Sequence, residues 1–155
     1  MRAHLLAATG LKLSTAIVPN APGYAGGSEF SKWMWEYWRG AYDLKALAQA
    51  LDLVCLITYD QHTRWTTPGP VAGMPWTMEH LEYALKVVPK EKLSLGIPLF
   101  GYHWYAGNPV KDDGKEAYYI DSDESFPLAQ RFGATMQWDP VEHEAWFYFY
   151  RDGMR

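Results

Sequence analysis

Two short groups of residues could take part in chemistry. Tyr59 and Asp60 follow an apolar run that ends at Thr58, so a phenol and a carboxylate stand together at the end of an expected strand. Such a pair could hydrogen-bond a polar substrate, and it could equally satisfy backbone groups of the following loop. The acidic run from Asp121 to Glu124 is the second group. Acids in the first turn of a helix interact favourably with the helix dipole, which accounts for this run without a catalytic role.

Aromatic residues are unusually frequent, at 16% of the chain with eight tryptophans. Most of these rings must help to build the core, but aromatic faces also stack on the apolar faces of sugar rings. The candidates for such stacking are Trp33, Tyr102, Trp104 and Trp138. Trp33, Trp35 and Trp38 do not share one helical face, so we expect at least one to be exposed and the other two to pack in the core.

The elements that must position these groups alternate along the chain. Three short apolar runs, Leu11–Val18, Leu53–Thr58 and Leu93–Phe100, are typical of strands that are covered on both faces. Between them, helical spacing of apolar residues predicts one helix through Leu44–Leu51 and another through Met78–Val88, with Thr77 as its N-cap. This order predicts parallel strands joined by right-handed crossovers.

The segments after the first two expected strands, 19–42 and 61–76, are long and rich in Gly, Pro and Trp, as loops are. In a (β/α)8 barrel, the loops that follow the strands form the active-site face. After the third strand the pattern predicts a helix over Ser122–Phe132, ended by Gly133. Two antiparallel strands, Thr135–Trp138 and Ala145–Tyr150, are expected next.

Composition excludes several classes of protein. The 155 residues are 48% hydrophobic, which is enough for a core, and the net charge of −4 argues against nucleic acid as a partner. No basic run or long apolar stretch indicates membrane association. Cys55 is the only cysteine and is expected to be a small buried hydrophobe. The histidines lack metal-like spacing, and no cofactor-binding motif is present, so we expect neither a metal nor a cofactor.

Three parallel strands would leave two open sheet edges. Because both ends also look like interrupted elements, we expect the chain to be part of a larger domain or to associate with itself through those edges. We expect residues 1–105 to be barrel and residues 106–155 to be an α+β insertion.

Two segments carry a family resemblance. Ile57-Thr58-Tyr59-Asp60 is similar to the Met-x-Tyr-Asp motif that ends the sixth barrel strand of glycoside hydrolase family 18, with Ile in place of Met. Gly96-Ile97-Pro98-Leu99-Phe100-Gly101 resembles the seventh strand of the same family. The resemblance is strongest to the bacterial branch of chitinases and spore-cortex peptidoglycan glucosaminidases. It implies a partial (β/α)8 TIM barrel, strands five to seven, followed by a small α+β insertion from Tyr118 onward.

The resemblance also implies a chemistry. Family members cleave β-1,4 bonds beside N-acetylglucosamine in chitin or peptidoglycan, and the substrate's own acetamide oxygen attacks the anomeric carbon. Tyr59 would donate a hydrogen bond to that acetamide, and Asp60 would accept one from the sugar or tune the field of the catalytic acid. Members commonly act outside the cell or in its envelope, but the sequence does not indicate a location for this chain.

The family's acid is the Glu of Asp-x-x-Asp-x-Asp-x-Glu, and this motif is absent from the 155 residues. In Asp121–Glu124 the Glu falls one place early and Ser125 holds the required position. We therefore expect the isolated chain to be inactive. Three hypotheses remain: part of an active hydrolase, a non-catalytic carbohydrate-binding relative, or a non-functional fragment.

Overall fold

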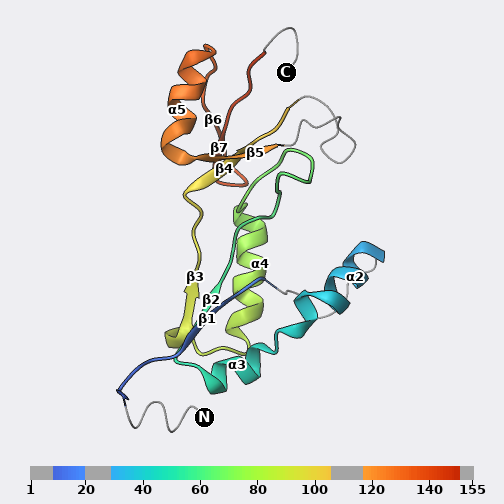
Figure 1. Ribbon diagram of the computed structural model, residues 1–155, viewed down its shortest axis with the longest axis vertical. Coiled ribbons are helices and arrows are strands. Elements are labelled where there is room, and N and C mark those ends of the chain that lie inside the picture. Colours follow the sequence, from blue (N-terminus) through green and yellow to red (C-terminus); the bar gives the residue numbers. More distant parts are fainter. Residues whose placement is uncertain (1–8, 20–28, 106–116, 151–155) are drawn as a thin grey trace. The chain divides into compact units, whose positions relative to one another are not determined.

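The protein was analysed as a computed structural model that describes residues 9–19, 29–105 and 117–150 (Figure 1). Its contacts divide the chain into two compact units. The first unit comprises residues 1–58 and 77–96, and the second comprises residues 59–76 and 97–155. Among the described residues, no helix is both long enough and apolar enough to cross a bilayer.

The first unit is built on a three-stranded parallel sheet in the order β1-β2-β3. Its strands are β1 (Ser14–Ile17), β2 (Leu53–Leu56) and β3 (Leu93–Leu95). Ile17 pairs with Leu56, and Leu56 pairs with Leu95. The predicted parallel order is confirmed, and within the described residues β1 and β3 are the two edges of the sheet.

Helices cover one face of this sheet. Figure 1 shows α3 (Leu44–Ala50) and α4 (Met74–Leu85) beside the strands. Asp43 caps α3, because its side chain accepts a hydrogen bond of 2.9 Å from the Ala46 amide. The remaining helical elements of this unit are α2 (Glu29–Tyr37) and the 3₁₀ turns η1 (Arg39–Ala41) and η2 (Lys90–Lys92). The core between sheet and helices consists of Ile17, Leu44, Ala48, Leu51, Val54, Leu56, Ala84 and Val88.

The other face of the sheet is largely open, so the expectation that these strands are covered on both faces is wrong. Side chains alternate between faces along a strand. Val54 and Leu56 therefore point into the core, whereas Leu53 is 38% exposed and Cys55 is only half-buried. Ser14 and Ala16, which pair with Leu53 and Cys55, are exposed as well. The described residues of this unit hold no second layer to cover that face.

Two helices differ from the sequence expectation. α4 begins at Met74, so Thr77 lies inside it and is not its N-cap. Pro75 explains the earlier start, because proline is well tolerated in the first turn of a helix. α2 occupies part of a segment that was expected to be a loop. No glycine or proline interrupts Glu29–Tyr37, and Lys32 forms an ion pair of 2.7 Å with Glu29 one turn away.

The run Leu93–Phe100 does not form a single strand. β3 ends at Leu95, and Phe100 begins β4 (Phe100–His103) in the second unit. Pro98 lies between them and has no N–H to give to a ladder, which accounts for the interruption. β4 pairs in antiparallel fashion with β5 (Tyr118–Asp121), a strand that the sequence pattern did not predict.

The rest of the second unit is helix and hairpin. α5 (Ser122–Arg131) confirms the predicted helix, and Gly133 follows it with φ of +62°, a conformation that favours glycine. β6 (Gln137–Asp139) and β7 (Glu144–Trp146) form an antiparallel pair that is shorter than predicted. The strands are shorter than predicted at their outer ends, and the turn between them is tight, because the Asp139 carboxylate accepts hydrogen bonds from the Val141 and Glu142 amides.

Candidate functional site

The candidate site lies in the second unit and begins where β2 ends. Thr58 directly precedes it in the chain and is 2% exposed, and its hydroxyl donates a 2.8 Å hydrogen bond to the Gly96 carbonyl. This bond fixes the chain just before Tyr59 and Asp60. Asp60 has φ of +64°, in the left-handed region that is costly for most residues but accessible to Asp. A strained residue at a strand end is typical of functional sites.

Asp60 is joined to Tyr102. The Tyr102 hydroxyl donates a hydrogen bond of 2.8 Å to Asp60 Oδ1. Burial raises the pKa of Tyr102 well above its usual value, and the hydrogen bond to Asp60 and its charge raise the pKa further. The phenol therefore stays protonated at neutral pH and holds the exposed carboxylate in one orientation.

Aromatic rings surround this pair. Phe100 is the common neighbour: its ring lies 5.6 Å from Tyr59 and 5.8 Å from Tyr102, both edge to face. Tyr119 stacks on Phe100 with a centroid distance of 4.8 Å and an interplanar angle of 27°. We call Tyr59, Asp60, Phe100, Tyr102, Trp104 and Tyr119 the Tyr59 cluster. Such a group offers flat apolar faces together with phenol and carboxylate oxygens, which is the surface that a sugar ring requires.

Trp104 extends the cluster along the chain. Its ring lies 5.7 Å from that of Tyr102, and its indole N–H donates a 3.1 Å hydrogen bond to the Thr63 carbonyl. The bond fixes the indole against the segment that follows Asp60. The structure thus brings together four of the six predicted site residues, namely Tyr59, Asp60, Tyr102 and Trp104.

Sequence reasoning missed Phe100 and Tyr119 as members of the cluster. Tyr119 lies opposite Tyr102 in the β4–β5 pair. Its hydrogen bond to Asp121 raises the pKa of the Tyr119 phenol, so this side chain also stays neutral. The run of strand-favouring residues Tyr118-Tyr119-Ile120 is the signal that could have predicted this strand.

The two remaining candidates lie outside the cluster. Trp138 is 61% exposed, and the ring beside it is that of His143, at 6.1 Å. Trp33 is on α2 in the first unit and packs on Tyr37 at 5.9 Å. Trp33 and Trp38 are both exposed and Trp35 is half-buried, so the expectation that two of these three tryptophans pack in the core is wrong. These rings lie at the surface of their unit.

A loop beside the cluster is held by acidic side chains of the β6–β7 hairpin. The Glu144 carboxylate accepts hydrogen bonds from the Val71 and Ala72 amides, which follow each other in the chain. Gly73 packs so closely on the Glu142 carboxylate that a Cβ atom there would displace this side chain. The segment from Asp60 to α4 is therefore fixed to the hairpin at its far end.

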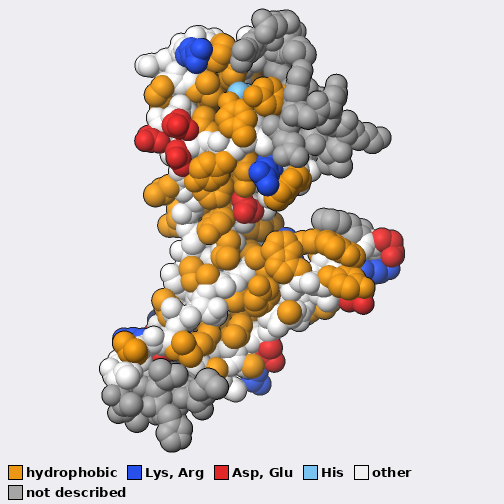
Figure 2. All heavy atoms as spheres, viewed as in Figure 1, with side chains coloured by type: hydrophobic (Ala, Val, Ile, Leu, Met, Phe, Trp, Pro, Cys, Tyr) orange, Lys and Arg blue, Asp and Glu red, His pale blue; other side chains and the backbone are white. Residues whose placement is uncertain are grey.

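Figure 2 shows hydrophobic side chains on the visible surface, with few charged groups among them. Those exposed in the second unit include Tyr119, Trp138, Trp146 and Tyr148. In the described ranges, no group of three or more His, Cys, Asp or Glu side chains is arranged to hold a metal ion. The Tyr59 cluster offers the polar groups of Tyr59, Asp60 and Tyr102 for hydrogen bonding and aromatic faces for stacking.

The sequence and the fold were compared with known proteins. The family model for Glycosyl hydrolases family 18 matches residues 2–153. The chain is 27% identical over 153 residues to the cortical fragment-lytic enzyme of Bacillus anthracis, a match that covers 90% of this chain and 33% of the relative. Several such curated relatives are covered over only 20% to 33% of their length.

Solved structures show the same similarity. The spore cortex-lytic enzyme SleL of Bacillus cereus matches with a TM-score of 0.79 and 26% identity, over 94% of this chain and 31% of that one. The chitinase of Chromobacterium violaceum matches with a TM-score of 0.77 and 28% identity, over 97% of this chain and 43% of that one.

Proposed function

The chain belongs to glycosyl hydrolases family 18, and we propose that it is part of a glycoside hydrolase that cleaves β-1,4 bonds in polymers of N-acetylglucosamine. Its share of that function is to hold and orient the sugar. The observation that carries the proposal is the Tyr59 cluster, in which Tyr59 and an oriented Asp60 stand among aromatic faces.

The proposal places the chain in a partial (β/α)8 barrel. β1, β2 and β3 would be its fifth, sixth and seventh strands, and the elements from β5 onward would be the α+β insertion after the seventh strand. The parallel order β1-β2-β3, with helices on one face, supports this assignment. The uncovered face of the sheet would then be the barrel interior, and its small side chains, Ser14 and Ala16, suit a packed interior.

The reaction would proceed by substrate assistance with retention of configuration. The acetamide oxygen of the bound sugar forms a bond to the anomeric carbon while the glycosidic C–O bond breaks, and the leaving oxygen takes a proton from an acid. Tyr59 would donate a hydrogen bond to the acetamide and orient its oxygen for attack. Asp60, held by Tyr102, would accept a hydrogen bond from the sugar through its second oxygen. Water would then form a bond to the anomeric carbon and give up a proton to the conjugate base of that acid, while the bond between the anomeric carbon and the acetamide oxygen breaks and the acetamide is restored.

The acid of this scheme is outside the 155 residues. Glu124 is exposed in the first turn of α5, where its charge favours the helix dipole. Glu124 does not belong to the Tyr59 cluster, and the sequence around it does not match Asp-x-x-Asp-x-Asp-x-Glu. We therefore expect the isolated chain to bind sugar without turnover, because leaving-group protonation is missing.

The polymer would be chitin or peptidoglycan glycan. The similarity to chitinases, which are named for chitin, and to cortical fragment-lytic enzymes, which are named for fragments of the cortex, supports this choice. Neutral hydroxyl and acetamide groups also suit a cluster whose one carboxylate is already hydrogen-bonded.

Binding of chitotetraose to the purified chain tests the proposal. Calorimetry measures the affinity of wild type, Tyr59→Phe and Asp60→Asn for this sugar. Tyr37→Phe is the matched control, because Tyr37 is an exposed tyrosine of the first unit. Loss of one hydrogen bond predicts an affinity about 5- to 10-fold weaker for Tyr59→Phe and Asp60→Asn, with Tyr37→Phe unchanged.

Hydrolysis is measured on the same samples. Binding without release of shorter oligomers is the expected result for this chain. Turnover would contradict the assignment of the acid to a segment outside it. Absence of binding, or equal binding by the Tyr59→Phe variant, would remove the Tyr59 cluster as the sugar site.

A further inference from the structure

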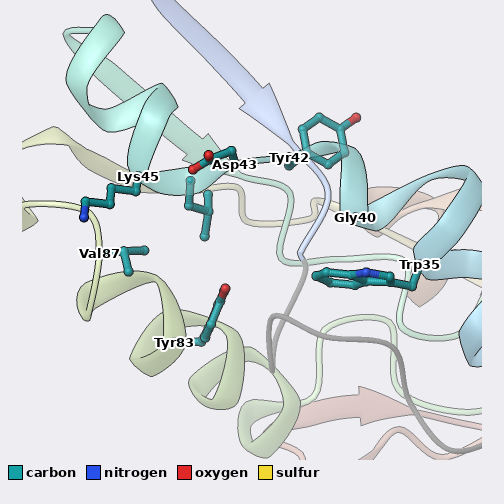
Figure 3. Close-up of a pocket in the computed structure, with 8 residues that line it drawn as sticks. Trp35, Gly40, Tyr42, Asp43, Lys45, Tyr83 and Val87 are labelled. Carbon is teal, nitrogen blue, oxygen red and sulfur yellow. The ribbon is translucent and has the colours of Figure 1, made fainter.

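A pocket lies in the first unit, where α3, α4 and the segment α2–η1 meet (Figure 3). Its volume is about 260 Å³ and it opens to solvent. The residues that shape it include Trp35, Gly40, Tyr42, Asp43, Lys45 and Tyr83. None of these residues belongs to the Tyr59 cluster, so any ligand bound here would be an addition to the function proposed above.

The Trp35 indole forms one wall because residue 40 is a glycine. A Cβ atom at Gly40 would lie 2.6 Å from the Trp35 carbonyl oxygen and 2.9 Å from the indole atoms Cε2 and Nε1. The ring therefore packs directly on the backbone of η1, and any larger residue would displace it. Figure 3 shows the indole extending from α2 towards the pocket. Since Trp35 is only half-buried, part of its flat surface is available to a ligand.

Polar groups also line the pocket. Within residues 9–19, 29–105 and 117–150, the Tyr83 hydroxyl and the Trp35 indole N–H form no hydrogen bond to a protein atom. Figure 3 shows the Tyr83 hydroxyl pointing from α4 towards the start of α3, which carries Asp43. Asp43 Oδ1 accepts from the Ala46 amide, so its second carboxylate oxygen is the one left for a ligand.

We propose that this pocket binds a single neutral pyranose ring, in a sugar site separate from the Tyr59 cluster. An aromatic face with a few hydrogen-bonding groups at its edge matches the apolar face and the equatorial hydroxyls of a pyranose. The opposite charges of Asp43 and Lys45 lie two residues apart at the start of α3, which favours a neutral ligand over an anion. The volume is below the roughly 300–1,000 Å³ that drug-sized ligands occupy, so one ring is the unit that fits.

Indole N–H signals in nitrogen-15 NMR can report the two sites separately. Methyl N-acetyl-β-glucosaminide is titrated into the chain while the Trp35 and Trp104 signals are followed, since Trp104 belongs to the Tyr59 cluster and Trp35 does not. A single ring held by few contacts predicts a dissociation constant on the order of millimolar. The expected result is a saturable shift of the Trp35 signal.

Three variants test the geometry. Gly40→Ala should displace the indole and raise the dissociation constant measured at Trp35 by about 10-fold. Tyr83→Phe should raise it by about 3- to 5-fold, because one hydroxyl is lost. Trp33→Ala, on the same helix but outside the pocket lining, should leave it unchanged. Tyr83→Phe is the smallest change, so it remains informative even where Gly40→Ala disturbs η1.

The outcomes separate this proposal from the function of the Tyr59 cluster. A Trp104 shift without a saturable Trp35 shift up to about 50 mM sugar would overturn the second site and leave the first intact. A Trp35 shift that survives both Gly40→Ala and Tyr83→Phe would overturn it as well. A Trp35 shift that both variants weaken would support the second site, whatever the Trp104 signal does.

Discussion

The Tyr102 hydroxyl donates a 2.8 Å hydrogen bond to Asp60 Oδ1 and thereby connects strand β4 to the residues that follow β2. The two residues are 42 positions apart in sequence. The bond occupies one oxygen of an exposed carboxylate and leaves the other for a ligand. Orientation of this kind reduces the entropy that a binding site must lose when the ligand arrives.

Removal of the Tyr102 hydroxyl should loosen Asp60. Tyr102→Phe keeps the ring contacts with Phe100 and Trp104 but removes the hydrogen bond, so we expect a loss of about 1 kcal/mol in the free energy of unfolding. Urea unfolding of wild type and variant measures this difference. Tyr150→Phe, at an exposed tyrosine of the same unit, is the control. Equal unfolding midpoints for Tyr102→Phe and wild type would show that the bond does not hold Asp60.

The backbone of Asp60 provides a second prediction. With φ of +64°, this position suits Asn and Gly better than Ala. Asp60→Ala and Asp60→Asn both remove the carboxylate charge, but we expect the Ala variant to be less stable than the Asn variant by about 1 kcal/mol, because the Asn side chain can hydrogen-bond locally in the left-handed conformation and Ala cannot. Thermal unfolding of the pair gives the comparison. An Ala variant as stable as the Asn variant would contradict a left-handed Asp60.

The sequence predicted most of the first unit because its signals are local. The apolar spacing through Leu44 and Ala48 indicates α3, and the branched residues of Leu53–Leu56 indicate β2. What it could not predict is the open face beside Cys55. A short apolar run predicts a buried strand, but it does not indicate whether residues of the same chain cover the second face of that strand.

The candidate site was predictable only in part for a similar reason. Tyr59 and Asp60 come just after β2, where the sequence places them without knowledge of tertiary structure, and Tyr102 lies within β4. Tyr119 meets Phe100 only through the register of β4 with β5, and strand register is a tertiary property. Trp138 matched the composition of a sugar site, but composition does not indicate that its neighbour is His143.

Glu144 should control the order of the loop that follows Asp60. Its carboxylate accepts from two successive amides, those of Val71 and Ala72, and an amide side chain can accept with only one oxygen. We expect Glu144→Gln to speed hydrogen exchange at one or both of these amides by about 10-fold. Glu124→Gln, an exposed acid on α5, is the matched control. Exchange as slow in Glu144→Gln as in wild type would mean that the carboxylate does not anchor the loop.

The stability of the first unit should fall on acidification because of His80. This side chain of α4 is 4% exposed, and burial lowers its pKa from 6.5 to about 4, with the positive charge of Arg39 acting in the same direction. The unfolded chain therefore takes up a proton near pH 6.5, whereas the folded chain resists protonation until about pH 4. Between these values the unfolded state binds more protons, so the free energy of unfolding decreases as the pH falls through this window.

The variant His80→Gln removes that titration. It should have a lower melting temperature than wild type at pH 7.5, because a buried side chain is replaced. Between pH 6.5 and pH 4, however, its melting temperature should fall by less than that of wild type. Parallel melting curves across this pH range measure the difference in slope, and His143→Gln on the exposed hairpin turn is the control. His143 helps to lower the pKa of Asp139, so the His143→Gln control also changes the titration of that carboxylate. The effect of His80 is therefore taken from the difference in slope between wild type and His80→Gln, which share His143 and Asp139. Identical slopes for wild type and His80→Gln would mean that the imidazole is hydrated enough to be protonated in the folded chain.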